Sequence, residues 1–137
     1  MIQSVPAVPD LDSRTEIHDF VVAFYRAIVF DDVLERVFDE IAEVDWALHI
    51  PKLVDYWCKV LLGDPSYVGA MFAAHEHLHG VEPLRPEWFE RWHELFVETL
   101  EAGWAGPGAD HAVEHAERQL AILHRRLLGG ELARGGT

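Results

Sequence analysis

Three of the nine histidines in this 137-residue chain fall within five positions, at His75, His77 and His79. A helix would place His75 and His79 on one face, and the string between them satisfies H-E-x-x-H, in which two histidines bind zinc and Glu76 is the general base. That pattern is short and arises by chance. A zinc hydrolase would also need a third protein ligand and a substrate cleft, to which nothing in the sequence points, so it stays an alternative.

Several segments instead carry one polar group on an otherwise apolar, aromatic stripe. Tyr25 follows Phe20 and Phe24, His49 precedes Tyr56 and Trp57, and His75 follows Met71 and Phe72. A flat macrocycle buried between helices requires such a lining, with one neutral imidazole to bind iron and a few hydrogen-bond donors opposite it. The residues therefore favour a cofactor site between helices.

The elements that would position these groups are all helical. Apolar residues recur at helical spacing and no segment alternates like a strand, which predicts an all-α chain with short connections. Ser13 and Glu16 form a capping box for the first helix, which we expect to end near Asp31. Further helices are expected from Asp45 to Gly63, from Ala70 to Gly80, from Pro86 to the Gly103–Gly108 stretch, and from Asp110 to Gly129.

Two details of these helices bear on the site. Pro51 lacks a backbone donor, so either the second helix begins at Pro51 or its entry turn is bent with His49 at the bend. His111 and His115 also lie four residues apart, but in the polar opening of the last helix. Solvent-exposed histidine is the expected interpretation there.

The composition is that of one globular domain. Eleven basic residues against 24 acidic ones give a formal net charge of −13, so the chain repels phosphate backbones and anionic lipid, and we expect no nucleic-acid or membrane partner. The single cysteine, Cys58, and the lack of a signal-like start predict a cytoplasmic protein. We expect a loose arm over residues 1–13, one domain over 14–130 and a flexible tail over 131–137.

Four segments, in this order and at nearly these spacings, resemble group III truncated haemoglobins over residues 16–128: HDFVVAFYRAIV, VFDEIAEVDWALH, YWCKVLLGDPSYVG and PEWFERWHELFVETL. The Tyr-Trp pair followed by Leu-Leu-Gly and Tyr-x-Gly, and then Phe-x-Arg-Trp, makes the resemblance specific. It implies a shortened globin fold, a two-layer helical sandwich around haem b.

The resemblance also implies roles for individual residues. His75 is similar to the proximal iron ligand, Tyr25 to the distal tyrosine, His49 to the distal histidine, and Trp92 to the tryptophan that closes the distal pocket. Phe38 resembles the aromatic that wedges the haem. From its place beside Met71 on the stripe that carries His75, we also expect Phe72 at the cofactor.

Two departures from the family pattern leave alternatives open. The connection from His75 to Trp92 is longer by a few residues, so His79, on the same apolar face, is the main rival for the iron. His77 is the third choice, because its side chain would face away from that stripe. Pro51 follows His49 by two residues, so His49 either touches the ligand or gates access to it.

The function that the resemblance implies is binding of oxygen, nitric oxide or peroxide at haem iron. Tyr25 and Trp92 would both donate hydrogen bonds to a ligand with partial negative charge, which slows its release. Slow release suits a dioxygenase or peroxidase better than transport, although no residue establishes turnover. Nitric oxide dioxygenation would need a separate reductase, because the chain has no flavin or nicotinamide signature. A cofactor-free, acidic helical interaction module is the third class.

Overall fold

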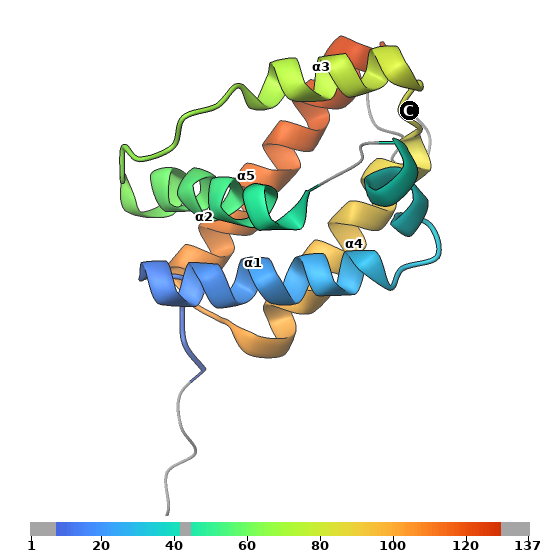
Figure 1. Ribbon diagram of the computed structural model, residues 1–137. Helices are drawn as coiled ribbons and strands as arrows, with labels where there is room; N and C mark the ends of the chain where they lie inside the picture. Colours follow the sequence, from blue (N-terminus) through green and yellow to red (C-terminus); the bar gives the residue numbers. More distant parts are fainter. Residues whose placement is uncertain (1–7, 42–44, 130–137) are drawn as a thin grey trace, which may run out of the picture.

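The computed structural model describes residues 8–41 and 45–129, and within these ranges the regular elements are all helices (Figure 1). They are α1 (Arg14–Val29), η1 (Val37–Ile41), α2 (Trp46–Leu62), α3 (Met71–Val81), α4 (Pro86–Gly103), α5 (Pro107–Leu123) and η2 (His124–Leu128). The all-α prediction is confirmed. The expected tail and the first seven residues of the expected arm lie outside the described residues. None of the described helices is both long and apolar enough to cross a membrane.

Local signals set most helix starts. The Ser13 hydroxyl accepts from the Glu16 N–H at 3.2 Å at the start of α1, and the Asp45 carboxylate accepts from the Ala47 N–H at 3.1 Å at the start of α2. Pro51 therefore lies inside α2, not at its first position. Gly63, with a left-handed φ of 74°, ends this helix, as glycine does at helix C-termini.

The start of α5 depends on a residue far away in the sequence. The Asp10 carboxylate accepts hydrogen bonds from the N–H groups of Gly108 and Ala109 at 2.9 and 2.8 Å, which places negative charge at the positive end of the helix. The helix consequently begins at Pro107, three residues before the predicted Asp110. Leu11, the next residue, is 1% exposed, so this part of the expected arm is packed.

The helices form two layers, with α1 and α2 in front of α4 and α5 in Figure 1. Each front helix contacts one behind it, α1 against α4 and α2 against α5. Phe96 of α4 meets Phe20 and Phe24 of α1 edge to face at 5.1 and 5.3 Å, and burial of each ring contributes roughly 1.5–3 kcal/mol. This core fixes α1, which carries Tyr25, against α4, which carries Trp92.

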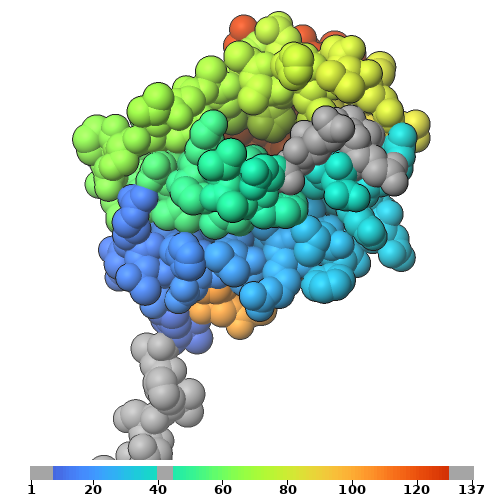
Figure 2. Space-filling model, viewed as in Figure 1, coloured from blue at the N-terminus to red at the C-terminus, as the bar shows by residue number. Residues whose placement is uncertain are grey.

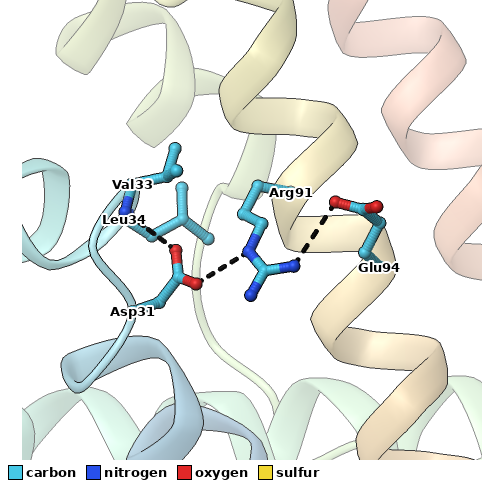
Figure 3. Close-up of polar contacts among 5 residues, drawn as sticks. All are labelled: Asp31, Val33, Leu34, Arg91 and Glu94. Atoms are coloured by element: carbon cyan, nitrogen blue, oxygen red, sulfur yellow. Dashed lines mark hydrogen bonds and ion pairs between the residues drawn. The ribbon is translucent and has the colours of Figure 1, made fainter.

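An ion pair ties the turn after α1 to α4 (Figure 3). The Asp31 carboxylate, in a residue 8% exposed, accepts from Arg91 Nε at 2.7 Å and from the N–H groups of Val33 and Leu34 at 3.1 and 3.0 Å. Arg91 also contacts Glu94 at 3.5 Å. Since Arg91 directly precedes Trp92, the same contact sets the turn and the tryptophan relative to each other.

Candidate functional site: a cavity beneath α3

A cavity of about 690 Å³ lies between α2, α3, α4 and α5 and reaches the turn after α1. Figure 2 shows its surface opening as a recess between α2 and α3, with α5 behind. Helix α3 has no buried residue, although its inner face is apolar. That face lines the cavity with Met71, Ala74, His75, Leu78 and Val81. The inner side of α3 therefore faces open space.

His75 is held with one ring nitrogen directed to the backbone. Its Nδ1–H donates to the carbonyl oxygen of Met71, one turn earlier, at 2.7 Å. Because a neutral imidazole carries one proton, this bond leaves the Nε2 lone pair free. The ring also lines the cavity, so His75 has the tautomer and the location that a metal-binding imidazole needs.

Tyr25 lines the cavity from α1. In Figure 1, α2 lies between α1 and α3. It is 7% exposed, and the Trp92 indole N–H, which can only donate, hydrogen-bonds its oxygen. Burial raises the pKa of Tyr25 well above its ordinary value, and the bond from Trp92 opposes that rise. Tyr25 therefore keeps its proton and can donate it in a further hydrogen bond.

His49 is turned into the cavity in spite of Pro51. Its ring meets the Tyr25 ring edge to face at 5.8 Å. Burial lowers the pKa of His49, with smaller contributions from the charges of His75 and Lys52. The structure thus brings Tyr25, His49 and Trp92 to one cavity, and roles for them in ligand contact belong to the proposal below.

Trp46, which the sequence analysis missed, does not line the cavity but packs against three residues that do. Its ring stacks on Phe38 at 5.9 Å and 16°, and lies 5.5 Å from the Tyr25 ring and 5.6 Å from the His49 ring. Phe38 itself lines the cavity. Trp46 stands three residues before His49 at the start of the same helix, and this i, i+3 spacing was the signal that could have found it.

The remaining predicted residues lie differently. Phe72 is not among the residues that line the cavity. It follows Met71 by one position, about 100° around the helix, and the Arg126 guanidinium lies 4.0 Å over its ring. His79 accepts from the Leu84 N–H through Nδ1 at 3.0 Å, which occupies its lone pair. His77 was expected to face away, but it also lines the cavity.

A second polar contact in the cavity wall joins α2 to α5. The Tyr56 hydroxyl and His115 Nε2 are 2.6 Å apart, and both residues line the cavity. The expectation that His115 is solvent-exposed is wrong, because α5 begins earlier than predicted and its first turns pack against α2. The sequence carried no local signal for this pair, since its members are 59 residues apart.

The described residues do not supply the ligand set of a zinc hydrolase. Within them, no group of three or more histidine, cysteine, aspartate or glutamate side chains could hold a metal ion. A zinc enzyme needs at least three protein ligands. The chemistry that the cavity does offer is one free imidazole on α3, facing a set of hydrogen-bonding aromatic side chains.

An all-helical, two-layer fold enclosing a cavity with one free imidazole has the architecture of a truncated globin. The crystal structure of group III truncated haemoglobin from Campylobacter jejuni superposes with a TM-score of 0.78 and 25% sequence identity, over 91% of this chain and 100% of that chain. The resemblance to group III truncated haemoglobins and the truncated-globin fold are confirmed.

One curated relative supports the same class. The group 3 truncated haemoglobin ctb of Campylobacter jejuni subsp. jejuni is 31% identical over 80 residues, which are 56% of this chain. The aligned part spans 61% of that relative, less than two thirds of its length. No family model matches the chain.

Proposed function

We propose that this protein binds haem b in the cavity, with His75 as the iron ligand, and takes oxygen, nitric oxide or peroxide on the side of Tyr25, His49 and Trp92. The observation that carries the proposal is the inner face of α3. This face is apolar, has a free imidazole at its centre and contacts a cavity of about 690 Å³. Without a bound group, that apolar surface would stay in contact with water, which is unfavourable.

The residues present fit haem. The cavity volume is within the range of small-molecule and cofactor sites, and its lining is mostly apolar and aromatic, with a few convergent polar groups. The interaction-module alternative would leave the histidines as satisfied core groups, whereas His49 and His75 border open space here. When bound, ferrous haem supplies an open coordination position for a diatomic ligand.

The chain's own residues would set how that ligand is held. The bond from His75 Nδ1–H to the Met71 carbonyl fixes the ring and makes Nε2 a stronger electron donor. Trp92 donates to the Tyr25 oxygen, so the Tyr25 proton is free to donate to a ligand with partial negative charge. Apolar walls around these groups exclude water, which strengthens such bonds.

Turnover goes one step beyond ligand binding. The Trp92 N–H, which was expected to donate to the ligand, instead donates to the Tyr25 oxygen, so Tyr25 is the ligand's donor. A ligand held by Tyr25 leaves slowly, which favours dioxygenase or peroxidase chemistry. The sequence carries no flavin or nicotinamide signature, so sustained nitric oxide dioxygenation would draw electrons from a separate reductase. The reductase, the reaction and a cytoplasmic location stay predictions.

Haem titration of the haem-free protein tests the proposal. We expect an intense Soret band that saturates at one haem per chain. Ala74→Trp, which fills the cavity from α3, should abolish uptake, whereas Ala73→Trp, on the exposed face of the same helix, should not. Circular dichroism checks that both variants fold. Colourless protein with stoichiometric zinc would instead indicate a hydrolase, and protein with neither would indicate an interaction module.

A further inference from the structure

The hydrogen-bonded pair of Tyr56 and His115 is not used by the proposed ligand site. Tyr56 comes from the middle of α2 and His115 from the first half of α5. Their 2.6 Å contact is short, and both side chains line the same cavity as His75. The pair therefore borders whatever the cavity binds.

Further aromatic rings surround this pair. Trp57 lies 5.5 Å from the rings of both Tyr56 and His115. Tyr67, in the loop before α3, meets Tyr56 edge to face at 5.3 Å. Its hydroxyl fits closely over Gly69, where an added Cβ would lie 2.5 Å from that oxygen. Because Tyr67 is only partly buried, it connects Tyr56 with the protein surface.

The protonation states of Tyr56 and His115 define which of the two donates in their hydrogen bond. Burial raises the pKa of Tyr56 to about 12, with a smaller contribution from Tyr67. Burial lowers the pKa of His115, and the charges of Arg118 and His111 lower it further. At neutral pH a neutral phenol thus donates its O–H to the lone pair of a neutral imidazole. Loss of an electron makes a phenol strongly acidic. In this pair the His115 imidazole already accepts the hydrogen bond from the Tyr56 proton, so it can take that proton up.

We propose that Tyr56 is a one-electron donor to the haem bound in this cavity, with His115 as the acceptor of its proton. This inference rests on the proposed function, because the electron acceptor is haem that a hydroperoxide has oxidised. The hydroperoxide accepts two electrons and two protons and leaves as water and an alcohol, or as two waters. Tyr56 then returns one of the two electrons that the haem has lost.

In that step the Tyr56 O–H bond breaks, the electron passes to the oxidised haem, and the proton moves to His115 Nε2. The products are a neutral phenoxyl radical and an imidazolium ion. A small phenolic reductant next gives one electron to Tyr56, directly or through Tyr67, while His115 returns its proton to the Tyr56 oxygen. The reductant's own proton goes to solvent. A second reductant molecule returns the other electron by the same route, and the two protons released then match the two that the hydroperoxide took up.

Tyr25 is placed differently for this chemistry, although it borders the same cavity. Its oxygen accepts a hydrogen bond from the Trp92 N–H, and that donor cannot take up a proton. The imidazole nearest to it, His49, lies at 5.8 Å between ring centres. Of the two tyrosines compared, Tyr56 is therefore the oxidisable one, because its proton already has an acceptor in His115.

Electron paramagnetic resonance of rapidly frozen samples tests the proposal. Ferric, haem-loaded protein is mixed with hydrogen peroxide, and haem loading is measured separately from the Soret band. We expect a tyrosyl radical in the parent protein and loss of most of that signal in Tyr56→Phe when the two are compared at equal haem loading. His115→Gln should slow radical formation about tenfold or more, because an amide accepts a hydrogen bond but not a proton.

The outcomes are distinguishable. A chain that takes up no haem overturns the proposed function and this inference with it. A chain that takes up haem but forms no tyrosyl radical overturns this inference alone, as does an undiminished radical in Tyr56→Phe. An unchanged rate in His115→Gln would show that the 2.6 Å contact only joins two helices.

Discussion

Tyr25 combines three properties in one side chain: it is buried, it accepts a hydrogen bond from Trp92, and it lines the cavity. Its hydroxyl proton is therefore available to a ligand bound there. A hydrogen bond to a charged acceptor contributes about 1.5–3 kcal/mol, so Tyr25→Phe should raise the oxygen dissociation rate roughly tenfold or more. Stopped-flow displacement of oxygen measures this rate, and an unchanged rate would remove Tyr25 from its proposed role.

Residue types and local spacing indicated which side chains in this region face inward, whereas their contact with a ligand stays a prediction. Tyr25, His49, His75 and Trp92 all line one cavity, because each stands on the inward stripe of its own helix. Local spacing did not predict the direction of every side chain, because neighbouring positions on a helix point to different sides. Phe72 lies next to Met71 but on another side of α3, and only the placement of Arg126 shows where its ring packs.

At the scale of elements, the Asp31–Arg91 ion pair holds the turn after α1 against α4 (Figure 3). Asp31→Ala removes the acceptor of two backbone N–H groups and leaves Arg91, which is 32% exposed, without its buried partner. We expect a loss of about 2 kcal/mol in the free energy of unfolding. Denaturant titration measures it. Glu94→Gln, which removes the more exposed partner of Arg91, is the control and should cost less than about 0.5 kcal/mol.

Most helix boundaries could be predicted because their signals are local. Ser13, Asp45, Gly63 and Pro86 act within their own turn of helix. The start of α5 could not be predicted, because its capping carboxylate, Asp10, is 98 residues away from the Gly108 N–H. The Tyr56–His115 contact could not be predicted for the same reason. The periodicity of one helix shows which of its faces is apolar, but not which other helix packs against that face.

At the scale of the whole molecule, the half-buried His115 predicts how stability depends on pH. The pKa of His115 is lower in the folded chain than its ordinary value of 6.5. The folded state then binds a proton more weakly than the unfolded state, so stability is full above 6.5 and is lost as pH falls through the lowered pKa.

The haem-free protein should accordingly lose thermal stability between about pH 7 and pH 5, and the loss should be smaller in His115→Gln. His18→Gln, on the exposed side of α1, is the matched control. Thermal melts at several pH values measure both. An equally steep loss in His115→Gln and in the parent protein would show that other groups set the acid sensitivity.

Haem binding in this cavity, as proposed, requires one coordination bond, from His75 Nε2 to haem iron. The absorption spectrum of the ferrous, haem-loaded protein tests that bond most directly when it is recorded for the parent chain, His75→Ala and His79→Ala. We predict that His75→Ala loses the five-coordinate spectrum or the haem itself, and that His79→Ala keeps both. Loss in His79→Ala alone would contradict the assignment.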